Sequence, residues 1–228
     1  MQYYIPNMLI RRSRLRGTFA VMLSVTKPWS MGLSATGTWL EANWGDGSPI
    51  EHYTSEDLST SKGHNYATGT YIASFKGAVT RFTLPQVGEY GNKDPIIGCN
   101  FNWDALPGLD NITGLFQYCG NLASTLDGLI PVRNLDSAFM HCAKLRTGSG
   151  LRLRPDITRL YHTFNGCTLA DFDINNFGES FPALANLGYC LYNSGFWGDA
   201  SAFVAKCTNP SLGRTEAFAG SRCTNIPA

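Results

Sequence analysis

The sequence predicts a mainly β protein, in which a small β-sandwich is followed by a short solenoid of about five repeated units. Three observations support this expectation. Short segments of alternating polarity fill the first third of the chain, and a Phe-x-x-Cys motif then recurs at nearly constant spacing. The 228 residues include 24 glycines and 11 prolines, but only 15% are charged. This composition is typical of short strands and compact turns and argues against long helices.

Residues 18–84 contain four segments with the length and alternation of short strands, at 19–25, 37–44, 69–75 and 79–84. They predict the sandwich. Between the second and third lies Trp44-Gly-Asp-Gly-Ser48, in which Asp46-Gly47 is a strong signal for a tight turn. We therefore interpret Trp44, Asp46 and Gly47 as parts of a structural turn.

The same turn carries a family resemblance. Trp44-Gly-Asp-Gly-Ser48, followed by His64-Asn-Tyr66 and Gly69-Thr-Tyr71, resembles the immunoglobulin-like domain of the polycystic kidney disease (PKD) type. The spacing between Tyr66 and Gly69 is one residue shorter than in the family pattern. The resemblance implies a PKD-like sandwich in which the Asp-Gly turn and the tyrosine are structural and Asp46 is no metal ligand.

The repeated motif begins at residues 116, 139 and 164, at intervals of 23 and 25 residues, and weaker copies follow at Leu191 and Phe218. In these two copies Ser194 and Ser221 replace the cysteine. A position that accepts either residue requires a small side chain, and a buried free cysteine behaves as a small hydrophobe. An aliphatic residue precedes each of the first four anchors by four positions, and a leucine, namely Leu122, Leu145 and Leu169, follows each of the first three by five or six. The expected structural repeat core comprises Phe116, Cys119, Phe139, Cys142, Phe164 and Cys167.

A second resemblance covers residues 109–223. The segment Leu135-Asp-Ser-Ala-Phe139-Met-His-Cys142-Ala-Lys-Leu145 resembles the unit of BspA-like leucine-rich repeats. This implies a leucine-rich-repeat solenoid over 85–228, with 85–108 as a capping segment that includes Phe101 and Trp103. A PKD-like sandwich followed by such repeats resembles the layout of bacteriophage structural proteins and of bacterial surface proteins.

The sequence predicts no cofactor and no metal site. It has seven cysteines but no Cys-x-x-Cys pair, which favours free buried thiols over zinc binding. For the four cysteines outside the repeat position, a disulfide remains an alternative. Asp171-Phe-Asp173 indicates a solvated turn more than a calcium site. The cysteines beside His141 and His162 occupy packing positions, so no catalytic dyad is expected and the chain is interpreted as no enzyme.

Charge and hydropathy exclude further classes of partner. A net charge of +1 provides no field that would attract nucleic acid. No segment reaches the ~20 apolar residues of a membrane span, so we expect no membrane insertion. The basic run that begins at Arg11 lies too late for a signal peptide, and no cleavage site follows it.

Residues 1–17 are predicted to form an N-terminal arm that docks either on its own domain or on a larger assembly. Its apolar residues would make the contact, and its arginines would meet carboxylates. The candidate anchoring residues are Tyr3, Tyr4, Ile5, Arg11, Arg12, Arg14 and Arg16.

Residues between the framework positions of a repeat are free to carry recognition. Phe196 and Trp197 lie in a glycine-flanked loop and are interpreted either as binding anchors or, for Trp197, as core. The candidate binding surface comprises Tyr118, His141, Arg152, Arg154, Tyr161, His162, Phe196 and Trp197.

These observations and the resemblances together predict a non-enzymatic bacteriophage virion structural protein, associated with the tail or baseplate and assembled in the host cytoplasm. It would mediate protein-protein attachment or host-surface adhesion through the repeat face. The expected partners are other virion proteins, bound through the arm in a multi-copy assembly, and a host surface glycan or protein. The alternatives are a fragment of an adhesin on the bacterial cell surface and a capsid decoration protein.

Overall fold

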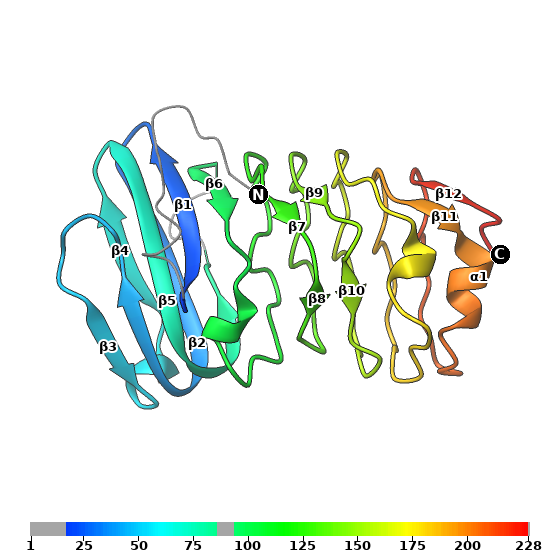
Figure 1. The fold of residues 1–228 in the computed structure, drawn as a ribbon, viewed down its shortest axis with the longest axis horizontal. Helices are drawn as coiled ribbons and strands as arrows, with labels where there is room; N and C mark the ends of the chain where they lie inside the picture. Colours follow the sequence, from blue (N-terminus) through cyan, green and yellow to red (C-terminus); the bar gives the residue numbers. More distant parts are fainter. Residues whose placement is uncertain (1–16, 86–93, 228) are drawn as a thin grey trace.

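The computed structural model describes residues 17–85 and 94–227 and shows a mainly β protein. It is elongated, with an antiparallel sheet at one end and a stack of parallel turns that continues to the C-terminal end (Figure 1). No helix among the described residues is long and apolar enough to cross a membrane. The candidate anchoring residues Tyr3, Tyr4, Ile5, Arg11, Arg12, Arg14 and Arg16 lie outside the described residues.

Six strands form the antiparallel sheet in the order β3-β2-β5-β1-β6, and β4 pairs with β2 beside this path. The first part of β2 pairs with β4, and its longer second part pairs with β5, so one strand serves two sets of neighbours. The strands are β1 (Phe19–Val25), β2 (Trp29–Asn43), β3 (Glu51–Thr54), β4 (Lys62–Tyr66), β5 (Gly69–Thr83) and β6 (Ile96–Cys99).

The predicted strand 19–25 coincides with β1, whereas the predicted strands 69–75 and 79–84 are one continuous strand, β5. Gly77 lies between the two predicted strands and pairs with Leu40 in β2. A Cβ at Gly77 would lie 2.4 Å from the carbonyl oxygen of Trp39. Gly77 therefore marks a close approach of two strands and not a turn. The predicted strand 37–44 is largely the second half of β2, and β3, β4 and β6 were not predicted.

Beyond β6 the chain winds through turns that stack in parallel. Bridges connect Arg81 to Asn111 and then Asn134, Arg159, Asn186 and Gly213 in order. Short parallel pairs join β7 to β9, β8 to β10 and β11 to β12. The remaining elements are η2 (Asp57–Ser59), η3 (Trp103–Ala105), β7 (Thr125–Leu126), β8 (Leu129–Ile130), β9 (Arg146–Thr147), β10 (Arg152–Leu153), η4 (Ile174–Asn176), β11 (Trp197–Asp199), α1 (Ala200–Ala205) and β12 (Arg222–Thr224).

The phenylalanine anchors form a column inside the stack. Phe139 lies fully buried between Phe116 and Phe164, with ring centroids 5.9 Å and 5.6 Å away. The backbone N–H groups of Phe116, Phe139 and Phe164 each donate to a carbonyl of the following turn, as from Phe139 to Thr163 at 3.0 Å. The same bond from Leu191 to Ala217 places the weaker fourth copy in the same register.

One framework residue was assigned wrongly. Leu122 and Leu145 are fully buried, but Leu169 is 51% exposed, and the neighbouring Ala170 is buried instead. The inward position is the sixth after the anchor, and Leu169 is only the fifth. A shift of one residue along an extended segment turns the side chain to the other face.

The cysteines at the repeat position connect successive turns. Cys142 Sγ donates to the carbonyl of Phe116 at 3.0 Å, and Cys167 Sγ donates in the same way to Phe139. Ser194 Oγ donates at 2.7 Å to Leu191, within its own turn. Burial raises the pKa of the Cys167 thiol to about 12. All seven cysteines are free, so this position holds a small donor and no disulfide.

The sheet and the stack share one hydrophobic core. The rings of Phe19 in β1 and Phe116 in the stack lie 6.3 Å apart, and Phe101 contacts Phe116 at 5.8 Å. The backbone N–H of Phe82 donates to Asn111 at 3.1 Å, which joins the end of β5 to the first turn. The sheet thus closes one end of the stack, and the predicted boundary at residue 84 lies within a continuous core.

Candidate functional site

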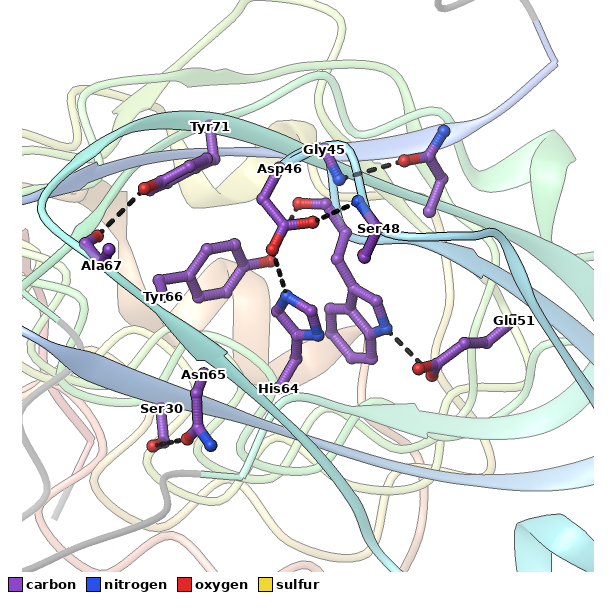
Figure 2. A network of polar contacts seen from close by, with 12 residues as sticks. Ser30, Gly45, Asp46, Ser48, Glu51, His64, Asn65, Tyr66, Ala67 and Tyr71 are labelled. Carbon is purple, nitrogen blue, oxygen red and sulfur yellow. Dashed lines mark hydrogen bonds and ion pairs between the residues drawn. The ribbon is translucent and has the colours of Figure 1, made fainter.

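The predicted tight turn lies at the centre of a polar network on the sheet (Figure 2). His64 Nε2 lies 2.7 Å from Asp46 Oδ2, and the amide of Ser48 donates to Asp46 Oδ1 at 3.0 Å. The imidazole of His64 stacks on the Trp44 indole at 4.8 Å, with the two planes 8° apart. Tyr66 donates its hydroxyl to the carbonyl of Trp44 at 3.0 Å. The network thus binds the turn to β4.

The same contacts define the electrostatics of the turn. The Ser48 hydroxyl faces Asp46 without completing a well-formed hydrogen bond, and together with the His64 imidazole and the Ser48 amide it holds the pKa of Asp46 well below its usual range. No hydrogen bond joins Ser48 to His64 among the described residues, so the three side chains do not form a nucleophile and its base. These are the contacts of a structural turn.

A second cluster follows the outer edge of the stacked turns. The rings of Tyr118 and His141 stack at 5.2 Å, and those of His162 and Tyr189 stack at 4.7 Å with their planes 3° apart. The edges of Tyr161 and Tyr192 contact this row. We call the cluster the aromatic edge, and it consists of Tyr118, His141, Tyr161, His162, Tyr189 and Tyr192.

Four of these rings stand on left-handed backbone, with φ of 62° at Tyr118, 59° at His141, 55° at His162 and 53° at Tyr189. Such a conformation costs a residue other than glycine on the order of 1 kcal/mol or more. Equivalent positions in other turns carry residues without rings, of which glycine and asparagine adopt this conformation at lower cost: Gly114, Ser137, Gly166, Asn193, Glu216 and Gly220. The backbone therefore does not require rings at these positions.

The rings are also fitted to one another. A Cβ at Gly166 would lie 2.6 Å from Nδ1 of His141, so the absence of a side chain there makes room for the imidazole. Nδ1 of His162 lies 2.9 Å from the amide nitrogen of Asn165. Desolvation, and then the proximity of His141, lower the pKa of His162. The neutral imidazole of His162 is therefore favoured at pH 7.

The structure brings together only part of the predicted binding surface. Tyr118, His141, Tyr161 and His162 all belong to the aromatic edge. Tyr189 was missed, although it lies 27 residues after His162, at the equivalent position of the next unit. The weaker anchors Leu191 and Phe218 also follow the preceding anchor by 27 residues, so this spacing could have predicted Tyr189 from the sequence.

The other predicted residues lie elsewhere. Arg152 donates to the carbonyls of Ser149 and Leu151, and Arg154 pairs with a neighbouring carboxylate. Phe196 is fully buried, so its assignment as a surface anchor was wrong, because its ring completes the core of the stack. Trp197, the next residue, is 40% exposed on β11.

The acidic pair and the repeat cysteines that the sequence singled out are engaged in structural contacts. Asp171 pairs with Arg222 at 3.1 Å, and Asp173 caps η4 by accepting from the amide of Asn175. Cys142 and Cys167 are buried, and both donate to backbone carbonyls. Within residues 17–85 and 94–227, no three His, Cys, Asp or Glu side chains are grouped so that they could hold a metal ion.

Comparison of the chain with protein-family models, curated proteins and solved structures finds no match. A functional assignment therefore depends on the geometry of the aromatic edge and on the motif resemblances of the turn and the repeats.

Proposed function

We propose that this chain is a non-enzymatic attachment protein that binds its partner through the aromatic edge. The observation that supports this most directly is the presence of four rings at left-handed positions where glycine would be less strained. Strain of this kind is typical of functional surfaces. Contact of these rings with another molecule would account for the strain.

The exposed faces of the edge suit a protein or glycan partner. Tyr118 is 43% exposed and Tyr161 is 37% exposed, whereas the backbone beneath them is held by the ladder between turns. Rigid, partly exposed tyrosines contribute strongly to protein interfaces because they bury much area at small entropic cost. The aromatic edge is thus organised before binding.

The biological setting that we propose is the bacteriophage virion, in the tail or baseplate. Its support is the resemblance of residues 44–71 to a PKD-like immunoglobulin-type sandwich and of residues 109–223 to BspA-like leucine-rich repeats, arranged in that order. In this proposal the repeat face adheres to the host surface or to a neighbouring protein. The arm at residues 1–17 attaches the chain to other virion proteins.

Glycine variants of the edge test the binding role without disturbing the backbone. Tyr118→Gly combined with His141→Gly removes one stacked pair, worth about 0.5–1.5 kcal/mol, while relieving a similar amount of left-handed strain. The stability should therefore change by less than about 1 kcal/mol, while attachment to purified virions or to host cells falls at least ~10-fold.

Arg146→Ala is the matched control, because it removes an exposed side chain of β9 outside the aromatic edge and outside the predicted binding surface. Its attachment should equal that of the wild-type chain. Unchanged attachment of the double glycine variant, measured by co-sedimentation, would show that the edge is not the binding surface. Deletion of residues 1–16 tests the arm separately, by incorporation into particles.

A further inference from the structure

A groove of about 560 Å³ lies where the sheet meets the stack. It is lined by residues of η3 and of the segment that follows it, by Thr80 of β5 and by charged side chains of the first turns. Its volume is within the range of small-molecule sites. The groove is separate from the aromatic edge, because none of the six edge residues lines it.

Two ion pairs in the groove fix the directions of its polar groups. Arg133 donates to both oxygens of Asp110, at 2.6 and 2.9 Å. Arg154 donates to both oxygens of Asp156 at 2.7 Å and also reaches the carbonyl of Pro131 at 3.1 Å. Bidentate pairs of this kind hold both partners in a defined plane. Each carboxylate oxygen keeps a lone pair for a ligand, and Arg133 keeps further N–H donors.

Two neighbouring side chains of η3 line the groove without a hydrogen bond to another described residue. Trp103 lines the groove and is only 7% exposed, and its buried Nε1 has no acceptor among the described residues. Asp104 also lines the groove, and its exposed carboxylate forms no hydrogen bond or ion pair with another described residue. The exposed Asp104 carboxylate is therefore available to accept hydrogen bonds from a bound molecule.

We propose that this groove binds a neutral saccharide. Hydroxyl groups donate and accept, so they match a surface that offers carboxylate acceptors and guanidinium donors side by side. Three carboxylates face two guanidiniums in the groove, which disfavours an anion. The guanidiniums disfavour a cation. Leu106, Pro107 and Pro131 supply apolar contact for the C–H face of a sugar ring. The inference does not depend on the aromatic edge.

The test uses the full chain and a panel of neutral probes: glucose, galactose, N-acetylglucosamine and their disaccharides. Saturation-transfer NMR detects binding, and tryptophan fluorescence gives the affinity. We expect at least one sugar to bind with a millimolar or lower Kd. Asp104→Asn and Arg133→Gln should each weaken it at least ~5-fold. Asp104→Asn alters an exposed side chain that pairs with no other described residue, and it keeps the proposal testable if Arg133→Gln unfolds.

The stack offers a matched control, because Arg159 pairs with Asp136 one turn further on, outside the groove. Arg159→Gln breaks another arginine–aspartate pair between turns and should leave sugar binding unchanged. If Arg133→Gln and Arg159→Gln weaken sugar binding equally, the proposal is wrong. It is also wrong if no neutral sugar binds or if the chain prefers glucuronate. The glycine variants at Tyr118 and His141 should bind sugar normally, and loss of binding there would assign the sugar to the aromatic edge instead.

Discussion

Phe139 provides the most direct test of how the stack is held together. Its ring is fully buried and has three aromatic neighbours, Phe116 at 5.9 Å, Phe164 at 5.6 Å and Phe101 at 6.1 Å. Each aromatic pair contributes about 0.5–1.5 kcal/mol beyond the burial of its area. Phe139→Leu should therefore lower the free energy of unfolding by about 2–4 kcal/mol, and Phe139→Ala by about 3–5 kcal/mol, because a cavity is added.

Phe181→Leu is the matched control. Phe181 is also buried, but its ring contacts only one other ring among the described residues, that of Phe203 at 5.7 Å. Its replacement should cost about 1–2 kcal/mol, by loss of one ring pair and slight repacking. The difference between the two leucine variants, about 1–2 kcal/mol, measures the contribution of the continuous column.

The assay is urea denaturation followed by tryptophan fluorescence and by far-ultraviolet circular dichroism. At this chain length each kcal/mol corresponds to about 2–4 °C in Tm, so thermal unfolding gives a second reading. Equal destabilisation by Phe139→Leu and Phe181→Leu would refute the reasoning, because the column would then add nothing to ordinary burial. The denaturant slope should stay constant, so that the midpoints can be compared.

Three further predictions follow from single contacts. Gly166→Ala should lower the free energy of unfolding, measured in urea, by about 1–3 kcal/mol, because Gly166 has a φ of 72° and the new Cβ would meet the ring of His141. His141→Gly should change the stability very little. Folding lowers the pKa of Asp46 from its ordinary 3.8, so the stability that this carboxylate provides is complete above about pH 4 and is lost as the pH falls below it. The Asp46→Asn variant should therefore be less stable than the wild-type chain at pH 7. Its stability should also fall less between pH 5 and pH 2, as measured by thermal unfolding. Burial raises the pKa of the Cys142 and Cys223 thiols, and Cys223 is the partly exposed cysteine of the seven, so a disulfide reagent at pH 8 should modify Cys223 first and all seven only after denaturation. Rapid native modification of Cys142 would contradict the packing described for it.

Local patterns predicted those parts of the fold whose determinants lie close together in the chain. Strand β1 is a single apolar run, and the Asp46-Gly47 turn carries its own conformational signal. The anchors at Phe116, Phe139 and Phe164 could be located because a stack of equivalent turns repeats its spacing in the sequence. These features require only the period of the pattern and the chemistry of individual residues.

Adjacent residues were harder to orient. Phe196 and Trp197 are both aromatic, and so their order in the chain does not say which one faces inward. The structure buries Phe196 and exposes Trp197, and it likewise buries Ala170 in place of Leu169. In extended segments a one-residue change of register reverses the face of every side chain, and the loops of the last units vary in length. Only the packed core selects the register.

The sequence by itself determined the mainly β class, the period of the stack, the tight turn and the small side chain required beside each anchor. These depend on local conformational preference and on repetition. The tertiary structure alone decided that the sheet and the stack share one core, that rings from successive turns form an aromatic edge, and that Asp110, Arg133, Arg154 and Asp156 meet beside Trp103. Their positions depend on how distant segments pack against one another, because side chains more than 20 residues apart become neighbours only when the turns stack.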